Sequence, residues 1–227
     1  MPAIECVSIM NNKSKTFCIY CSGGASRVIK FYSFKENIQK YKPKKVIYDG
    51  NRQDVFKELS ELFGQDIIHY NENIKNYNKE KIHTSTSKFL HYSLDKESID
   101  YLLCFGCKIL KKELIDSYPN KLINFHPSLL PSFKGPDAID QALEYGVFLI
   151  GNTAHFIDGG IDTGKIIIQS AMLTEEYNDY EDVLEMQFPM IKMVLRDILN
   201  YKISQKSIKK ELSNRNKKIL IPDKCII

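Results

Sequence analysis

The chain has 227 residues, 43% hydrophobic and 26% charged, with a formal net charge of +4. These values are typical of a globular protein, and the length suffices for one domain with a full core. The sequence lacks an 18-residue apolar run and a signal-peptide pattern, so we expect a cytoplasmic protein with no membrane partner. We interpret the densest basic run, Gln205–Lys218, as a solvated tail and expect no nucleic-acid partner.

Apolar periodicity predicts alternating strands and helices. Strands are expected at Thr16–Cys21, Lys45–Tyr48, Ile67–His69, Tyr101–Phe105, Lys121–Phe125, Val147–Ile157 and Lys165–Gln169. Helices are expected at Val28–Tyr41, Arg52–Phe63, Thr84–Lys96, Lys111–Ser117, Asp137–Glu144 and Tyr180–Tyr201, and the polar stretch Asn71–Lys81 is expected to be irregular. Gly146 should end its helix, and Pro189 should break or kink the last one.

This alternation predicts an α/β fold with a Rossmann-like, mostly parallel twisted sheet and helices on both faces. We expect a lead-in over residues 1–15, one catalytic domain over residues 16–201 and a tail over residues 202–227.

Four of the six cysteines form two CxxC pairs, Cys18/Cys21 and Cys104/Cys107, a spacing that also suits zinc. Both pairs lie on apolar, strand-like runs, where residues three apart face opposite sides. We therefore expect reduced thiols, with no metal site and no disulfide framework.

Two segments carry candidate chemistry. The run NFHPSLLP over residues 124–131 follows an apolar strand, and Asp162-Thr163-Gly164 lies downstream. Asn124 supplies a non-titrating donor, His126 titrates near neutrality, and Asp162 is suited to hold the histidine. This set suits transfer of a small acyl group to an amine, although a plain strand and loop with a surface histidine would also explain the spacing.

A glycine turn, Ser22-Gly23-Gly24-Ala25-Ser26, follows the first predicted strand. Backbone N–H groups at such a turn approach an anion closely, and a helix N-terminus adds partial positive charge. An ordinary strand-to-helix turn is the alternative reading, because the glycine spacing fits no dinucleotide or Walker motif.

The runs NFHPSLLPSFKG, from Asn124, and HFIDGGIDTGKIIIQ, from His155, resemble the 10-formyltetrahydrofolate-dependent formyltransferase family. Within it, the first run is most similar to the branch that acts on glycinamide ribonucleotide. The resemblance implies the formyltransferase fold, 10-formyltetrahydrofolate as cosubstrate without a metal, and a phosphorylated small-molecule amine as substrate. It also suggests a cis bond at Leu130–Pro131 and is compatible with a monomer or a homodimer.

The resemblance assigns roles to individual residues. Asn124, His126 and Asp162 are implied to be catalytic. The folate is implied to be held by Lys108, Ile109 and Leu110 and by the backbone of Ala154, His155, Ile157, Asp158, Gly159 and Gly160. The acceptor phosphate is implied to lie at Ser22, Gly23, Gly24, Ala25 and Ser26, with Glu185 as the acidic residue near the ribose.

Departures from the family pattern fall mostly in the acceptor pocket. Ala25 and Arg27 replace a glycine and an asparagine of the turn, and Glu185 is one place out of register. An amino-sugar nucleotide or another amine therefore stays open as acceptor, as does a folate- or nucleotide-binding protein without turnover. We expect neither methionyl-tRNA formyltransferase nor formyltetrahydrofolate hydrolase, because the chain leaves too little length for their additional domains.

Overall fold

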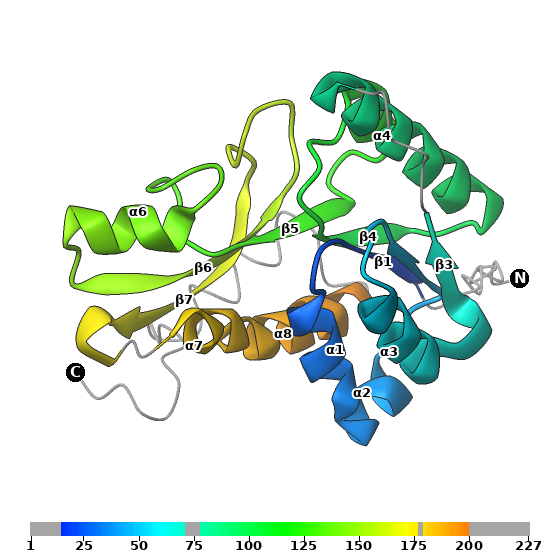
Figure 1. Cartoon of the computed structure of the whole chain (residues 1–227). Helices are drawn as coiled ribbons and strands as arrows, with labels where there is room; N and C mark the ends of the chain where they lie inside the picture. The colour runs from blue at the N-terminus through cyan, green and yellow to red at the C-terminus, as the bar shows by residue number, and fades with distance from the viewer. Residues whose placement is uncertain (1–14, 71–77, 177–178, 200–227) are drawn as a thin grey trace, which may run out of the picture.

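The computed structural model describes residues 15–70, 78–176 and 179–199. The predicted tail, nearly all of the lead-in, Cys6 and Cys225 lie outside the described residues. Seven strands form one sheet in the order β3-β2-β1-β4-β5-β6-β7 (Figure 1). They are β1 (Phe17–Cys21), β2 (Lys45–Tyr48), β3 (Ile67–His69), β4 (Tyr101–Phe105), β5 (Leu122–His126), β6 (Leu149–Phe156) and β7 (Ile166–Leu173).

The helices follow the predicted alternation. They are α1 (Ser26–Ser33), α2 (Lys35–Lys40), α3 (Gln53–Phe63), α4 (Lys79–Lys96), α5 (Lys112–Ser117), α6 (Ala138–Tyr145), α7 (Tyr180–Glu185) and α8 (Gln187–Leu199), with short 3₁₀ turns at Gly64–Asp66 and Thr174–Glu176.

The sheet is mostly parallel, as predicted. Strands β3, β2, β1, β4 and β5 pair in parallel, whereas β6 and β7 pair antiparallel. The order reverses between β1 and β4, because β2 lies on one side of β1 and β4 on the other. A crevice at the carboxyl ends of the strands is expected at such a reversal, and this is where open α/β sheets bind ligands.

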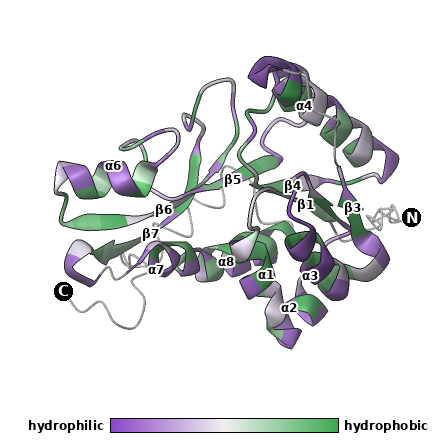
Figure 2. Ribbon diagram, viewed as in Figure 1, coloured by the Kyte–Doolittle hydropathy of each residue, from purple (hydrophilic) through white to green (hydrophobic). Residues whose placement is uncertain are grey.

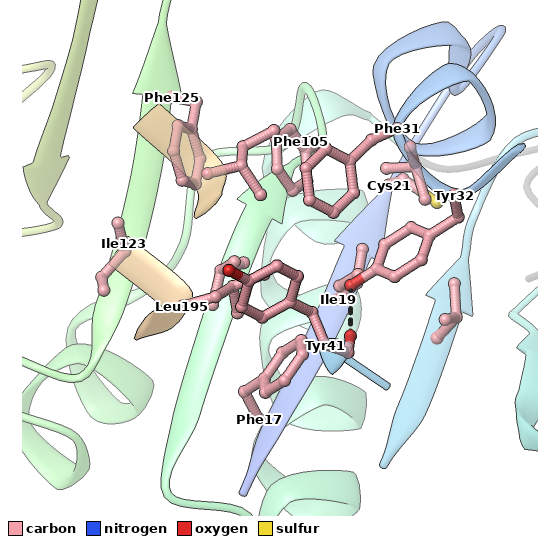
Figure 3. Packing of buried hydrophobic residues seen from close by; sticks show 14 of the residues in the cluster. Phe17, Ile19, Cys21, Phe31, Tyr32, Tyr41, Phe105, Ile123, Phe125 and Leu195 are labelled. Atoms are coloured by element: carbon pink, nitrogen blue, oxygen red, sulfur yellow. Dashed lines mark hydrogen bonds between the residues drawn. The ribbon is translucent and has the colours of Figure 1, made fainter. Parts of the chain in front are cut away.

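Two apolar clusters cover opposite faces of the sheet. One packs odd-numbered residues of β1, β4 and β5 against α1, α3 and α8 (Figure 3). The other packs the alternate residues of β1 and β4 against α4 and α5. Because both faces are buried, the central strands β1 and β4 are mostly hydrophobic, while helices such as α4 carry many hydrophilic residues (Figure 2).

The thiols follow this alternation. Cys21 lies in the cluster beneath α1, whereas Cys18 and Cys104 lie in the cluster beneath α4 and α5. Cys107 is exposed. The expectation that the CxxC cysteines lie on opposite faces of an apolar strand is therefore confirmed for Cys18 and Cys21.

Two predicted helices are each divided. The first breaks at Phe34, whose backbone is extended, and the buried Asn37 side chain donates to the carbonyl of Phe31 at 2.6 Å. The last breaks at Met186 rather than at Pro189. Pro189 instead lies in the first turn of α8, where the missing N–H of proline has no helical partner to lose.

Other boundaries differ by a few residues. Helix α4 begins at Lys79, inside the stretch expected to be irregular, because the Asn78 side chain accepts from the N–H of Lys81 at 2.9 Å. Strand β7 continues four residues past Gln169 to Leu173. Gly146 ends α6 in the left-handed conformation, as predicted. None of the helices in the described ranges is both long and apolar enough to cross a membrane.

Candidate active site

Strand β5 presents two polar side chains on one face. Asn124 and His126 are two residues apart, so they point to the same side, while Phe125 points into the opposite core. Asn124 pairs with His155 of β6 in the register of the sheet. The two strands together therefore bring an amide and two imidazoles to one place.

Asp162 comes from the connection between β6 and β7 and completes the cluster. Its Oδ1 accepts from Asn124 Nδ2 at 3.3 Å, and its Oδ2 lies 3.3 Å from His126 Nδ1. Oδ2 also accepts from the backbone N–H of Gly135 at 2.9 Å. The structure thus brings together Asn124, His126 and Asp162, as the sequence predicted.

Contacts to His126 indicate which ring nitrogen takes a proton. Nε2 lies 2.9 Å from the carbonyl oxygen of Phe133, which only accepts, so we assign the proton of the neutral ring to Nε2. Nδ1 is then the basic nitrogen, and it faces Asp162. Burial lowers the pKa of His126, although the Phe133 carbonyl and the Asp162 charge oppose that shift.

Asp162 is held in its ionised form. Burial acts to raise its pKa, but the contact with His155, the N–H of Gly135 and the charge of His126 outweigh burial. The net effect places the pKa of Asp162 below its ordinary value. A fixed negative charge beside a basic imidazole nitrogen is suited to stabilise a proton that arrives there.

Hydrogen bonds from Thr153 of β6 hold the turn that follows β5. Thr153 is fully buried, and its hydroxyl donates to Ser128 O at 2.7 Å while accepting from Leu130 N at 3.0 Å. The Leu130–Pro131 bond is cis, as the resemblance suggested. This turn leads to Phe133 and Gly135, whose backbone groups contact His126 and Asp162.

The residues assigned to the folate lie in two segments, the loop after β4 and the end of β6 with the connection that follows it. In the loop after β4, Leu110 is buried in the core, Lys108 is half-buried and Ile109 is 50% exposed. In the second segment, Ala154 and His155 are buried in β6, and Ile157 packs against the core beneath α4 and α5. Gly159 and Gly160 are exposed. The Asp158 carboxylate accepts a hydrogen bond from the Thr163 hydroxyl of the same loop at 2.6 Å.

The glycine turn has a feature that the sequence did not indicate. The Ser22 hydroxyl donates to Asp49 at the end of β2 and accepts from Cys107 N, so it is already used within the protein. Gly23 and Gly24 are exposed and Ser26 is half-buried. Ala25, which stands where the family pattern has glycine, adopts the left-handed conformation at φ 48°.

Glu185 lies apart from the Asn124, His126 and Asp162 cluster. Its carboxylate pairs with Lys30 of α1 at 3.1 Å, and its side chain is 53% exposed. Glu181 pairs with the same lysine at 2.8 Å. The structure therefore gives Glu185 a surface ion pair, and its predicted role near a ribose stays a prediction.

Two side chains make contacts at the site that the sequence did not predict. His155 was assigned only through its backbone, yet its Nε2 lies 3.4 Å from Asp162 Oδ1 and 3.3 Å from Asn124 Nδ2. His155 lies seven residues before Asp162, and this spacing did not indicate that its side chain would reach the site. Arg27 was noted as a departure from the glycine-turn pattern that could add charge there or point to solvent, and its guanidinium donates to the carbonyl of Phe125 at 3.0 Å.

Comparison with known proteins gives the family. A family model described as formyl transferase matches residues 32–188, which is more than half of the chain. The chain belongs to the formyl transferase family. This membership confirms the resemblance seen in the motifs.

Curated relatives in this family match over part of their length. A phosphoribosylglycinamide formyltransferase of Bacillus subtilis is 43% identical over 76 residues, covering 34% of this chain and 39% of that protein. A formyltetrahydrofolate deformylase of Haemophilus influenzae is 35% identical over 114 residues, covering 50% of this chain and 41% of that protein. The chain thus aligns with about two-fifths of each.

Solved structures share the fold of the formyl transferases. Glycinamide ribonucleotide transformylase 1 of Symbiobacterium toebii superposes with a TM-score of 0.68 at 24% identity, covering 83% of this chain and 89% of that one. A phosphoribosylglycinamide formyltransferase of Bacillus halodurans gives a TM-score of 0.59 at 26% identity, covering 91% and 100%. The predicted α/β formyltransferase fold is confirmed.

Within the described residues, no group of three or more His, Cys, Asp or Glu side chains is arranged to hold a metal ion. The histidines and the carboxylate at the site instead contact backbone groups and one another. That the reaction needs no metal stays a prediction.

Proposed function

We propose that this protein transfers the formyl group of 10-formyltetrahydrofolate to the primary amine of glycinamide ribonucleotide, a step of de novo purine biosynthesis. The observation that carries the proposal is the convergence of three side chains, in which the Asp162 carboxylate lies 3.3 Å from Asn124 Nδ2 and 3.3 Å from His126 Nδ1. The name of the Bacillus subtilis relative supports the choice of acceptor.

Asn124 is the proposed donor to the formyl oxygen. Both of its present contacts, to Asp162 and to His155, are 3.3 Å long, which is weak for N–H hydrogen bonds. Exchanging one of them for an oxygen that gains negative charge during attack therefore costs little and stabilises the tetrahedral intermediate.

His126 and Asp162 are the proposed proton carriers. Nδ1 of His126 is basic and neutral near pH 7, because burial lowers its pKa. It is suited to take the proton that the amine loses on attack. Asp162, 3.3 Å away, stabilises the imidazolium, from which the proton passes to the departing folate nitrogen.

The loops beside this cluster are the proposed folate site. The exposed Ile109 presents apolar surface for a flat heterocycle, and the peptide groups of residues 154–160 offer donors and acceptors along its edge. When bound, 10-formyltetrahydrofolate supplies the formyl carbon.

An amino-sugar nucleotide is the alternative acceptor. It is favoured by the Ser22 hydroxyl being engaged by Asp49 and by the ion pair between Glu185 and Lys30, since both residues were expected to touch glycinamide ribonucleotide. Hydrolysis is a further outcome, because other relatives are named formyltetrahydrofolate deformylase.

One assay separates these functions. Purified protein with 10-formyltetrahydrofolate is offered glycinamide ribonucleotide, an amino-sugar nucleotide or no acceptor, and both formyl product and free formate are measured. Acceptor-dependent formylation of glycinamide ribonucleotide supports the proposal. Preference for the amino-sugar nucleotide, or formate release without an acceptor, moves the assignment to the corresponding alternative. His126→Ala is the negative control for any turnover.

A further inference from the structure

Gln169 of β7 lies in one cross-strand row with His126. Thr153 of β6 is directly opposite His126 of β5, and Gln169 is directly opposite Thr153. The three strands are neighbours at one end of the sheet (Figure 1). Residues directly opposite one another in antiparallel strands project from the same face, so Gln169 lies on the same side of the sheet as the histidine.

The side chain of Gln169 contacts the turn that follows β5. Its Nε2 donates to Leu130 O at 3.0 Å and to Thr153 Oγ1 at 2.9 Å. The Thr153 hydroxyl gives its one proton to Ser128 O at 2.7 Å. Its oxygen therefore accepts from Gln169 and from Leu130 N, the latter at 3.0 Å. Because both carbonyl oxygens only accept, these contacts have one consistent arrangement of donors, with the amide nitrogen of Gln169 facing Leu130.

The anchored turn leads to the carbonyl that contacts His126. Ser132 N donates to Leu129 O at 3.1 Å, and the Ser128 hydroxyl donates to Ser132 O at 2.8 Å. The next residue, Phe133, has a positive φ of 51°, which a bulky residue rarely adopts. Such a conformation persists only where the surrounding contacts impose it, so the position of the Phe133 carbonyl depends on the anchored turn.

Packing alone does not fix this turn. A cavity of about 100 Å³ borders it, lined by Leu129 and Phe133 of the turn and by apolar residues of α6 and β6. A side chain beside a cavity lacks packing partners on that side. The hydrogen bonds from Gln169 and Thr153 therefore supply restraint that packing does not.

The position of Phe133 O decides which nitrogen of the neutral His126 ring carries the proton. Phe133 O lies 2.9 Å from Nε2, whereas Asp162 Oδ2 lies 3.3 Å from Nδ1. At equal distance the charged carboxylate is the stronger acceptor, so the Nε2–H form depends on the carbonyl being held closer. A displaced carbonyl would let the proton move to Nδ1, the nitrogen that must be free to take a proton from the attacking amine.

We propose that Gln169 is a positioning residue for His126. Through Thr153 and the turn over residues 128–133, it holds the Phe133 carbonyl so that the neutral ring keeps its proton on Nε2 and its basic nitrogen toward Asp162. The effect on turnover rests on the proposed formyl transfer. The effect on the imidazole does not.

The tautomer of His126 tests the proposal without substrates. Nitrogen-resolved NMR of the full-length protein, at a pH where the ring is neutral, gives the ratio of the two tautomers. Gln169→Met keeps an unbranched side chain but removes both donors. It should shift the ratio toward the Nδ1–H form by roughly three- to tenfold, the equivalent of one hydrogen bond. The matched control is Gln141→Met, which removes a similar contact, from Gln141 Nε2 to Pro136 O at 2.6 Å, and should leave the ratio unchanged.

Kinetics give a second readout. In Gln169→Met, kcat should fall by a factor similar to the tautomer shift while the KM of each substrate stays unchanged, because proton transfer is affected and binding is not. Thr153→Ser keeps the hydroxyl and should retain the wild-type ratio. If Gln169→Met does not fold, Gln169→Glu carries the test, because an ionised carboxylate has no donor for Leu130 O.

The outcomes separate the positioning role from the proposed function. An unchanged tautomer ratio in folded Gln169→Met, or an equal shift in Gln141→Met, overturns the positioning role. A raised KM with unchanged kcat also overturns it, since Gln169 would then act in binding. A tautomer shift in Gln169→Met, together with no formylation of glycinamide ribonucleotide by the wild type, rejects the proposed acceptor but keeps the positioning role.

Discussion

Nδ1 of His126 and Oδ2 of Asp162 lie 3.3 Å apart, although one ends β5 and the other belongs to the β6–β7 connection. In this arrangement the backbone of Asp162 has a positive φ of 49°, which aspartate and asparagine tolerate better than most residues. The same connection returns to β5 to contact Asn124. The position of the Asp162 carboxylate therefore depends on this unusual turn.

Asp162→Asn should remove most of the activity while keeping the fold. Asparagine matches the shape of aspartate and its tolerance of positive φ, but it cannot stabilise a proton on His126. We expect kcat to fall by about 10²–10⁴-fold, the range typical of lost acid–base catalysis. Initial-rate kinetics and circular dichroism measure the two effects. Asp140→Asn, an exposed acid of α6, is the matched control. Near-wild-type turnover in Asp162→Asn would contradict the assigned role.

The pKa of His126 should shift in opposite directions in the variants Asp162→Asn and Arg27→Gln. Burial lowers its pKa, Asp162 opposes this shift and Arg27 adds to it. Asp162→Asn should therefore lower the pKa further, and Arg27→Gln should raise it. Nitrogen-resolved NMR titration of the imidazole gives the values directly. The acid limb of kcat/KM should move with them, and a common direction in both variants would refute this electrostatic account.

The same shift makes a prediction about stability. The folded-state pKa of His126 lies below its value of about 6.5 in an unfolded chain, so the unfolded state binds the proton more readily. The neutral ring therefore contributes stability above about pH 6.5, and this contribution is lost as pH falls through the folded-state pKa. Urea unfolding at a series of pH values, compared with His126→Gln, isolates the effect. A pH-independent difference between the two proteins would contradict it.

Sequence patterns predicted the sheet and the catalytic cluster because both depend on local signals. Apolar runs identified each strand found in the described residues, and the alternation along β5 placed Asn124 and His126 on one face. The break at Phe34 was missed, and the break in the last helix was expected at Pro189 rather than at Met186. The first break is accompanied by a side-chain contact, in which Asn37 donates to the Phe31 carbonyl. Neither periodicity nor composition encodes such a contact.

Long-range polar contacts explain what the sequence did not reveal about the site. Ser22 appeared available for a phosphate, but Asp49 from another strand engages its hydroxyl. Arg27 appeared to be an irregular replacement in a turn, but Gln187 from α8 fixes it beside β5. In each case the partner is far away in sequence, so spacing within a motif carries no information about it.

The cysteines should bind no stoichiometric zinc. Cys18, Cys21 and Cys104 are buried, and burial raises the pKa of each thiol, which disfavours the thiolate that metals bind. In a Cys6→Ser/Cys225→Ser background, one thiol, Cys107, should react rapidly with a disulfide reagent, and the other three only on unfolding. Elemental analysis and thiol titration are the measurements. One tightly bound zinc per chain, or fast reaction of several thiols, would disprove this account.

Gly164→Ala should destabilise the fold at the Asp162-Thr163-Gly164 turn. A Cβ at Gly164 would lie 1.7 Å from the backbone carbonyl oxygen of Phe156, whereas a Cβ at Gly159 would meet nothing within 4 Å. Because the obstacle is backbone of β6, which pairs with β5, relief requires the turn to move away from the sheet. We expect a loss of about 1–3 kcal/mol or more in unfolding free energy for Gly164→Ala. Gly159→Ala in the same connection is the control for stability and should differ little from the wild type.

Since the displaced turn carries Asp162, the contact with His126 should lengthen, and any Gly164→Ala protein that folds should also lose turnover. Chemical denaturation of both variants at one pH makes the comparison, and equal stability of the two would show that the turn is not held against β6 as described.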